Sequence, residues 1–243
     1  IITANHVCAH LENLYDFFYG VEKLLTRDGI FIFEVGYRLN VIKKKTFDTI
    51  YHEHIDYHCL KPVIKFAKNF NLELFDFDLV EAQGGSIRFY LCRKNEKKIK
   101  INKINKQIKI EKKYKLFLNK TYYLYFKNIM KIKNNLKKIL LKYKKKNTEV
   151  AGYGAPAKAT TFTYFFELDK NIIKYIFDDS KIKQGKFTPG KKIPIINPKY
   201  FNLYRPDIVI VLAWNYYKDI IKKNKNLDYK PKFLIPFPKV KIL

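Results

Sequence analysis

The sequence predicts an α/β protein in which two α/β units are joined by a Lys-rich helical connector. Short apolar runs typical of buried strands alternate with helical patterns in residues 1–93 and again in residues 148–243. Residues 94–147 contain neither glycine nor proline, and their apolar residues recur every three or four positions, which is typical of one long helix or of two in succession. We therefore expect three parts, with boundaries at 1–93, 94–147 and 148–243.

The first unit is expected to open with the strand IITAN. Apolar residues between Leu14 and Leu25 then recur at helical spacing until Asp28-Gly29 ends the helix, and GIFIFEV follows as a buried strand. Helical character returns from Lys61 to Phe70, and LELFDFDLVEA and SIRFYLCR are two β runs separated by Gln83-Gly84-Gly85. This order predicts the later strands of a sheet that ends in a hairpin.

The second unit repeats the alternation of strands and helices. We expect a strand at EVAGYG, a helix from about Pro156, a strand at KYIFDD and a Gly/Pro-rich stretch over 184–198. DIVIVLAW is the next strand, followed by a helix and a last strand near FLIPF. Because βαβ connections place helices on both faces of a sheet, this unit predicts a parallel sheet.

The net charge of +27 raises nucleic acid or another polyanion as a partner. Only five arginines are present, so the excess is nearly all lysine, accompanied by abundant Ile, Asn, Phe and Tyr. That mixture also results from a coding sequence rich in A and T, and recognition of bases and phosphates favours the arginine fork. We do not expect nucleic-acid binding, and keep a basic protein that binds RNA or other polyanions as the alternative function.

The remaining composition favours a cytoplasmic protein. No run approaches the roughly 20 apolar residues that a membrane-spanning helix requires. The cysteines Cys8, Cys59 and Cys92 are widely spaced, with no CxxC pair, which is compatible with a reducing compartment. The chain opens on Ile1 inside an apolar run, without a charged segment or cleavage site before it, and we interpret it as a fragment.

All five histidines lie in the first quarter of the sequence. His6 and His10 follow the first predicted strand, and Tyr51, Glu53 and His54 lie in the polar segment after the FEV strand. Open α/β sheets bind ligands at the carboxyl ends of their strands, so the two groups could converge on one cleft. Imidazoles, a carboxylate and a phenol suit removal of a proton next to a carbonyl group.

Metal binding is a competing interpretation of these histidines. His54 and His58 are spaced as two ligands on one helix face, but HExxH is absent and Cys59 has no nearby partner cysteine. We therefore expect no metal site. For His6, His52 and His58, a role as satisfied polar groups explains the sequence as well as a chemical role.

Two glycine-containing segments could contact a ligand. Gln83-Gly84-Gly85-Ser86 is either an ordinary hairpin turn or a close approach of the backbone to a site, and Arg88 beside it could meet a phosphate or carboxylate. Gly152, Gly154 and Lys158 lie between a strand and a helix, where free backbone N–H groups can bind an anion. The full GxGxxG pattern is missing, because Ala157 takes the third position, so we do not expect an NAD site.

Several segments, in their order and spacing, resemble the sugar C-methyltransferases that use S-adenosylmethionine. They are ANHVCAH, FDTIYHEHIDYHCLKP, QGGSIRFY and GYGAPAKATT, followed by KIKQGKFTPGKKIPI, and together they cover nearly the whole chain. The resemblance implies that a base removes a proton from a 4-keto nucleotide sugar and that the resulting enolate attacks the sulfonium methyl group. It implies that His54 is the base, that His10 assists and that Tyr51 and Glu53 line the pocket.

The resemblance also implies a fold. Residues 1–93 would be the C-terminal half of a class I (Rossmann-like) methyltransferase sheet in which Gly84 and Gly85 let the backbone approach the substrate. From their position beside this turn, we expect Ser86 and Arg88 to contact the substrate as well. Residues 148–243 would form a second Rossmann-like domain that helps to bind the nucleotide sugar. From their position between a strand and a helix, we expect Gly152, Gly154 and Lys158 to contribute to this binding.

The sequence departs from the family in ways that bear on activity. The glycine-rich loop that holds S-adenosylmethionine and the N-terminal zinc-binding domain of the family have no counterpart in this sequence. Gly36 stands where a proline usually follows FEV, and Gln83 stands where a histidine is common, so that position cannot titrate. We expect little or no methyl transfer from residues 1–243 alone.

Overall fold

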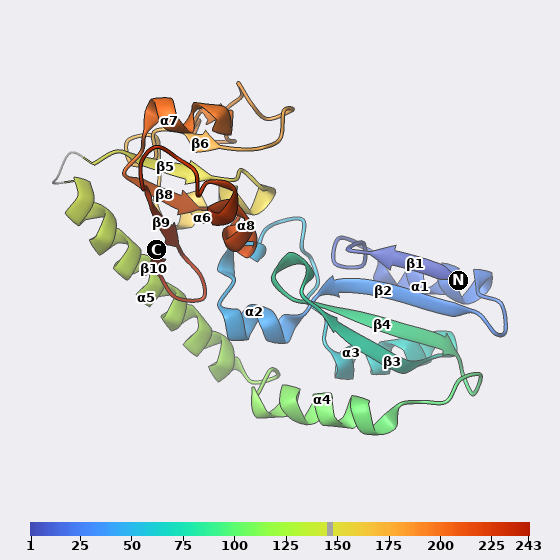
Figure 1. Cartoon of the computed structure of the whole chain (residues 1–243). Helices are drawn as coiled ribbons and strands as arrows, with labels where there is room; N and C mark the ends of the chain where they lie inside the picture. Colours follow the sequence, from blue (N-terminus) through green and yellow to red (C-terminus); the bar gives the residue numbers. More distant parts are fainter. Residues whose placement is uncertain (145–147) are drawn as a thin grey trace. The chain divides into compact units, whose positions relative to one another are not determined.

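The computed structural model describes residues 1–144 and 148–243, and it confirms the α/β fold class. Contacts divide the chain into two compact units (Figure 1). Unit 1 contains residues 1–44 and 52–125, and unit 2 contains residues 45–51 and 126–243. The division falls inside the stretch predicted as a connector, whose residues 145–147 lie outside the described residues. The three-part organisation stays a prediction.

Unit 1 contains a four-stranded mixed sheet. Its strands are β1 (Ile2–Asn5), β2 (Ile30–Gly36), β3 (Leu72–Val80) and β4 (Ser86–Arg93), in the order β1-β2-β4-β3. β1 and β2 are parallel, whereas β4 is antiparallel to both β2 and β3, so the predicted terminal hairpin is present. The register places Glu34 of β2 opposite Asn5 on one side and Arg88 on the other.

Helices complete unit 1. They are α1 (Leu14–Leu24), α2 (Arg38–Lys44), α3 (Leu60–Ala67) and α4 (Ile101–Lys113), with 3-10 turns η2 (Lys68–Phe70) and η3 (Ala82–Gly84). Asn13 caps α1 by accepting the backbone N–H of Asp16 at 3.0 Å. The core is aromatic: Phe18 of α1 meets Phe31 and Phe33 of β2 edge-to-face, with ring centroids 5.4 and 5.8 Å apart. The sequence did not predict α2.

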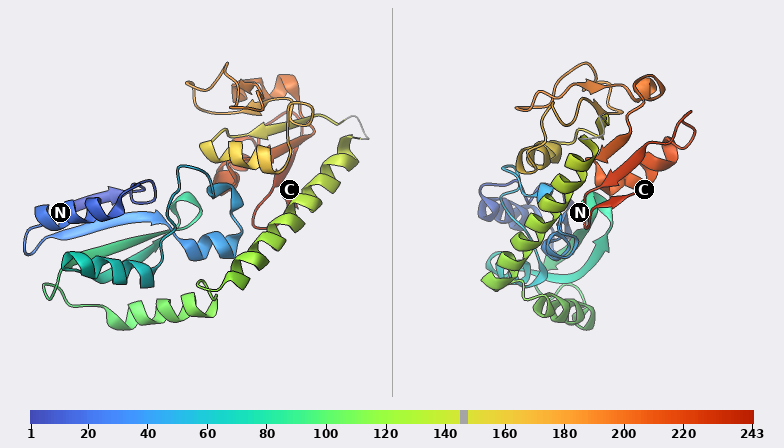
Figure 2. Two further views of the ribbon diagram at one scale, coloured as in Figure 1. Left: turned by 180° about the vertical axis from the view of Figure 1, so that it is seen from behind. Right: turned by 90° about the vertical axis from the view of Figure 1, so that its left-hand side faces the viewer.

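The Lys-rich stretch forms two helices in succession, α4 and α5 (Asn119–Lys144), and Figure 2 shows α5 as one uninterrupted helix. α4 is part of unit 1, where it contacts α3 and β3 and buries Ile104 and Glu111. From Phe126 onward α5 belongs to unit 2 and buries Ile129, Ile132, Leu136 and Leu140. The apolar periodicity of these helices therefore marks faces that pack onto the units.

Unit 2 contains a six-stranded sheet with the order β10-β9-β8-β5-β6-β7. The strands are β5 (Val150–Tyr153), β6 (Ile176–Phe177), β7 (Ile195–Ile196), β8 (Ile208–Val211), β9 (Lys232–Ile235) and β10 (Lys241–Ile242). All neighbours are parallel except β9 and β10, as the βαβ pattern predicts. β7, inside the Gly/Pro-rich stretch, and β10 were not predicted.

The helical elements of unit 2 connect these strands. Besides α5 they are α6 (Ala157–Phe165), α7 (Phe201–Tyr204) and α8 (Tyr217–Lys223), with 3-10 turns η1 (Phe47–Thr49), η4 (Pro198–Tyr200) and η5 (Trp214–Tyr216). η1 comes from the middle of the unit 1 sequence, and it contacts α6. Within the described residues, no helix is both long and apolar enough to cross a membrane.

Candidate functional site

The structure brings His10 and His54 together. Their imidazole centroids lie 4.9 Å apart, with an interplanar angle of 61°. His10 lies in the turn after β1, and His54 lies in the loop before α3. The backbone N–H groups of Ile55 and Asp56 donate to the carbonyl of Ala9 at 2.8 and 3.3 Å, and these bonds hold the two segments side by side. Two imidazoles from segments 44 positions apart in the sequence are therefore neighbours.

Neighbouring side chains distinguish this pair from the other histidines. The Tyr57 ring lies 6.2 Å from the His54 ring in an edge-on arrangement. His58 is buried, its Nε2 is 3.3 Å from the carbonyl oxygen of Cys8, and burial lowers its pKa. His58 is thus a neutral core residue, whereas His10 is exposed and His54 is half-buried.

Tyr51 and Glu53, predicted to line the same pocket, have different surroundings. Glu53 is exposed, and its Oε1 is 3.9 Å from Nε2 of His52, whose side chain is 89% exposed. Tyr51 is half-buried and is the last residue of the unit 2 segment 45–51. Within unit 1, the close pair thus consists of His10 and His54.

Arg88 is held by an acid at the end of β2. Its Nε and Nη2 donate to the same oxygen of Glu34 at 3.0 and 2.8 Å, and the other oxygen of Glu34 lies 3.4 Å from Nε2 of His6. The hydrogen bond with Tyr90 and then the hydrogen bond with Glu34 raise the pKa of Arg88. The Glu34 side chain is only 7% exposed, whereas that of Arg88 is 39% exposed. The charge of the guanidinium is thus balanced by Glu34, and the group remains accessible to solvent.

The glycine pair between β3 and β4 forms a tight turn. Gly85 has a φ of 121°, donates to the carbonyl of Ala82 at 2.8 Å, and accepts a hydrogen bond from the N–H of Tyr37 at 3.1 Å. A Cβ on Gly85 would overlap the amide of Asn40, so close packing explains this glycine. The Gly84 carbonyl accepts a hydrogen bond from Lys44 Nζ at 2.7 Å, and Ser86 is buried and donates to Ala82.

The loop after β5 is similarly filled by the protein itself. A Cβ on Gly152 would meet Ile176, and one on Gly154, which has a φ of 85°, would overlap Ala213. The backbone N–H of Ala155 donates to Asp178 at 2.6 Å, so a carboxylate of the chain occupies this part of the predicted anion site. Lys158 Nζ donates to Asn215 at 2.9 Å and lies 4.1 Å from the Trp214 ring centroid.

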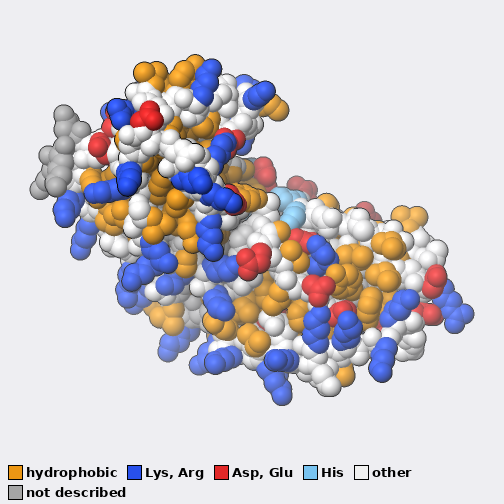
Figure 3. All heavy atoms as spheres, viewed as in Figure 1, with side chains coloured by type: hydrophobic (Ala, Val, Ile, Leu, Met, Phe, Trp, Pro, Cys, Tyr) orange, Lys and Arg blue, Asp and Glu red, His pale blue; other side chains and the backbone are white. Residues whose placement is uncertain are grey.

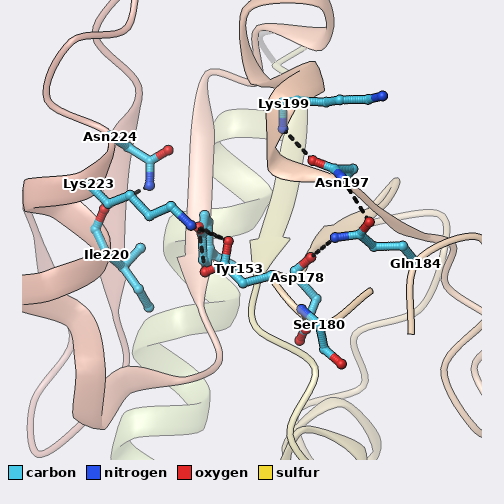
Figure 4. A network of polar contacts seen from close by, with 10 residues as sticks. Tyr153, Asp178, Ser180, Gln184, Asn197, Lys199, Ile220, Lys223 and Asn224 are labelled. Atoms are coloured by element: carbon cyan, nitrogen blue, oxygen red, sulfur yellow. Dashed lines mark hydrogen bonds and ion pairs between the residues drawn. The ribbon is translucent and has the colours of Figure 1, made fainter. Parts of the chain in front are cut away.

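Polar side chains gather at the carboxyl ends of the parallel strands of unit 2 (Figure 4). Asp179 forms an ion pair with Lys223 and accepts from the Tyr153 hydroxyl at 3.3 Å. Gln184 donates to the Asp178 carbonyl at 2.9 Å and accepts from Asn197 at 2.8 Å. This edge is where an open α/β sheet offers polar groups to a ligand.

Asp48 is a buried acid that the sequence analysis did not single out. It is fully buried in unit 2, and its Oδ2 accepts a hydrogen bond from Trp214 Nε1 at 2.6 Å. Its partner lies 166 positions away, so no local pattern marks the contact. The available signal was its place within FDTIYHEH, three residues before Tyr51.

The described part of the chain contains no preformed group of metal ligands. Among residues 1–144 and 148–243, His, Cys, Asp and Glu side chains form no cluster of three or more that could hold a metal ion. His54 and His58, which are spaced like two ligands, differ in surroundings, because His58 is packed against the Cys8 carbonyl.

Comparison with known proteins relates the chain to enzymes that methylate carbon. Residues 81–238 match the family described as the C-methyltransferase C-terminal domain. The C-methyltransferase NovU of Streptomyces niveus is 28% identical over 236 residues, which cover 97% of this chain and 56% of that relative. The chain thus spans a little over half the length of the curated relative. From the family match, which covers well over half of its residues, the chain belongs to the C-methyltransferase family.

Proposed function

We propose that this chain takes part in the C-methylation of a 4-keto nucleotide-linked deoxysugar, with S-adenosylmethionine as the methyl donor. The observation that carries the proposal is the pairing of His10 and His54, with ring centroids 4.9 Å apart, in a protein of this family. His54 is the general base and His10 assists it, with Tyr51 and Glu53 as further residues of the pocket. The substrate is a small molecule, and we propose a cytoplasmic location.

The chemistry needs a base more than it needs an acid. A C–H bond next to a ketone is weakly acidic, and an imidazole that titrates near neutrality can accept its proton. A bound S-adenosylmethionine would supply the methyl group that bonds to the carbon left with the electron pair, and its sulfur would leave as a neutral thioether. We expect His10, whose ring lies next to that of His54, to stabilise the imidazolium or the enolate oxygen by hydrogen bonding.

The glycine pair of unit 1 is not a candidate for the loop that binds the methyl donor. In class I methyltransferases a glycine-rich loop approaches the donor, whereas the glycine pair of unit 1 lies in the turn between β3 and β4 and packs on Asn40. We therefore assign no residue to hold S-adenosylmethionine. For the same reason we propose that the chain alone transfers little or no methyl group, and methyl transfer by residues 1–243 would contradict this part.

The substrate handle is assigned to cationic and backbone groups. Arg88 is accessible beside the glycine turn and suits a phosphate or a sugar oxygen. We place the nucleotide at the carboxyl edge of the unit 2 sheet, near Gly152, Gly154 and Lys158. A phosphate there would have to displace Asp178 from the Ala155 N–H and Asn215 from Lys158. Lysine and arginine side chains are scattered over much of the visible face in Figure 3, so long-range attraction of an anionic substrate needs no single patch.

Hydrogen exchange at the carbon next to the ketone tests the base without a methyl donor. A 4-keto-6-deoxy nucleotide sugar is incubated with the chain in D2O, and NMR follows replacement of the proton at C3 by deuterium. We expect exchange to be faster with the chain than with buffer, and to return to the buffer rate with His54→Gln. If the sugar binds, as shown by saturation-transfer NMR, and exchange equals that of buffer, His54 is not the base.

A further inference from the structure

The loop that carries His54 is anchored on its downstream side by unit 1. Ile55 and Asp56 donate backbone hydrogen bonds to Ala9, and the carbonyl of His58 accepts the N–H of Arg38 at 3.1 Å. These bonds fix the loop after His54. They leave its upstream side, which begins at Lys45, to be fixed by other contacts.

The upstream side is anchored by residues 45–51, which we call the anchor segment. It belongs to unit 2 although its neighbours on both sides in the sequence belong to unit 1. The Phe47 ring lies 4.1 Å from the Phe165 ring of α6, centroid to centroid, and Thr46 and Asp48 are buried. The anchor segment is therefore packed into unit 2, three residues before the predicted base.

Asp48 makes the directional contacts of the anchor segment. Its Oδ2 accepts the indole N–H of Trp214 at 2.6 Å and lies 3.9 Å from Nζ of Lys158. Its Oδ1 is buried and has no hydrogen-bond partner. Lys158 is the second residue of α6, which follows β5, and Trp214 is the first residue of η5, which follows the adjacent parallel strand β8. β5 pairs with β6 on one side and β8 on the other, so Asp48 is bound where the strand order reverses.

The buried contact between Asp48 and Lys158 is not expected to contribute much to stability. Burying a carboxylate and an ammonium group loses solvation free energy that their mutual attraction only partly offsets, and an apolar pair of similar size often stabilises the folded state as much. The tilted contact between the Phe47 and Phe165 rings already buries apolar surface. A hydrogen bond from one indole N–H to a carboxylate is directional, whereas a ring contact is not. It therefore restricts the orientation of the anchor segment.

We propose that Asp48 is a positioning residue for His54: its buried carboxylate, held by Trp214 and Lys158, fixes the anchor segment and thereby the loop that places the base beside His10. The catalytic part of this proposal rests on the proposed function, in which His54 is the base. The structural part, that a change at Asp48 alters the surroundings of the His54 imidazole, can be measured without substrate.

The test is NMR of the whole chain labelled with 15N. Trp214 is the single tryptophan, so its indole N–H gives one signal, and the imidazole signals of His54 and His10 are assigned from His54→Gln and His10→Gln. We expect Asp48→Asn to shift the Trp214 indole signal and also the signals and titration of His54. In the D2O exchange reaction, the same variant should lower the turnover of bound sugar about tenfold to a hundredfold with little change in KM.

Asp207→Asn is the matched control. Asp207 accepts the backbone N–H of Glu149 at 2.8 Å and precedes β8 at the end opposite to Trp214, so the same change of charge occurs in the same unit. It should leave the His54 signals unchanged. If Asp48→Asn does not fold, Trp214→Phe removes the N–H donor together with part of the indole ring but keeps an aromatic ring at this position, and it should shift His54 in the same direction.

Two results separate the possible failures. A folded Asp48→Asn chain whose indole signal moves while the His54 signals coincide with those of the parent overturns the positioning role. Coupling to His54 in a chain that shows no hydrogen exchange instead overturns the proposed function and leaves the structural coupling standing.

Discussion

The carboxylate of Glu111 on α4 accepts a hydrogen bond from the backbone N–H of Leu60, the first residue of α3, at 2.9 Å. The same oxygen accepts the hydroxyl of Tyr37 at 2.8 Å, and that hydroxyl accepts from Gln107 at 2.9 Å. No side chain at Cys59 caps α3, so a residue from α4 satisfies the beginning of the helix that follows the histidine loop. The Lys-rich helix is thereby part of the support of the candidate site.

Glu111→Ala should destabilise unit 1 by about 2–4 kcal/mol, because it leaves a buried helix end and a buried tyrosine hydroxyl without their acceptor. Glu111→Gln should cost less, since its amide oxygen can still accept. Urea unfolding followed by far-UV circular dichroism measures the loss. Trp214 lies in unit 2, so its fluorescence transition should change less than the dichroism transition.

Lys112→Ala, at the exposed neighbouring position on α4, is the control for Glu111. It should change the free energy of unfolding by no more than about 0.5 kcal/mol. A loss for Lys112→Ala as large as that for Glu111→Ala would show that the helix, and not the carboxylate, supports α3.

His54→Gln should reduce enzyme-dependent deuterium exchange into the 4-keto sugar by about 10²- to 10⁴-fold, the usual contribution of a positioned general base. His10→Gln should have a smaller effect, because its partner still accepts the proton. His52→Gln is the matched control, since the His52 side chain is 89% exposed, and it should exchange at the parent rate. If His52→Gln slowed deuterium exchange and His54→Gln did not, the base would be His52 and not His54.

Asp48 gives unit 2 a distinctive response to acid. Burial raises its pKa to about 6, against attraction to Lys158 and the Trp214 hydrogen bond, which lower it. The folded state then binds the proton more tightly than the unfolded chain, whose aspartate titrates near 3.8. The stabilisation from this group is full below about pH 3.8 and is lost as pH rises through about 6.

Tryptophan fluorescence of the native chain, titrated between pH 4 and 8, should therefore show a transition with a midpoint near 6. In Asp48→Asn this transition should be absent, while transitions caused by histidines persist. Persistence of the midpoint in Asp48→Asn would assign it to another group.

His58 should make unit 1 respond to acid in the opposite direction. Its pKa is lowered chiefly by burial, so the unfolded chain takes up a proton first, beginning near pH 6.5. Stability from His58 is complete above that pH and is lost as pH falls through the folded-state pKa. Urea midpoints measured by circular dichroism from pH 7.5 to 5 should fall in the parent chain and fall less in His58→Gln. An equal fall in both chains would exclude His58 as the cause.

Local patterns predicted the elements whose signal lies in their own residues. GIFIFEV, an apolar run bounded by Gly29, became β2, and the break at Gln83-Gly84-Gly85 correctly separated β3 from β4. β7, two residues long, was missed because its register comes from parallel pairing with β6 and not from its Gly/Pro-rich surroundings. α2 was missed because only Leu39 and Val41 mark its buried face.

The candidate site was predictable only in part. The rule that ligands meet the carboxyl ends of strands anticipated that His10 and His54 approach each other. The contacts that hold their surroundings connect distant positions, such as Asp48 with Trp214 and Leu60 with Glu111. A single sequence carries no signal for such pairs, because each residue type is ordinary in its own segment.

The anchor segment has a consequence for how proteins of this kind could be recombined. Because residues 45–51 are built into unit 2, the polypeptide passes from one unit to the other three times, and a single cut after Tyr125 would not yield two intact halves. A C-terminal half transferred to another protein would contain Trp214 but not Asp48, the acceptor of its indole N–H. Grafts that keep both partners from one parent should fold better than grafts spliced at a single junction.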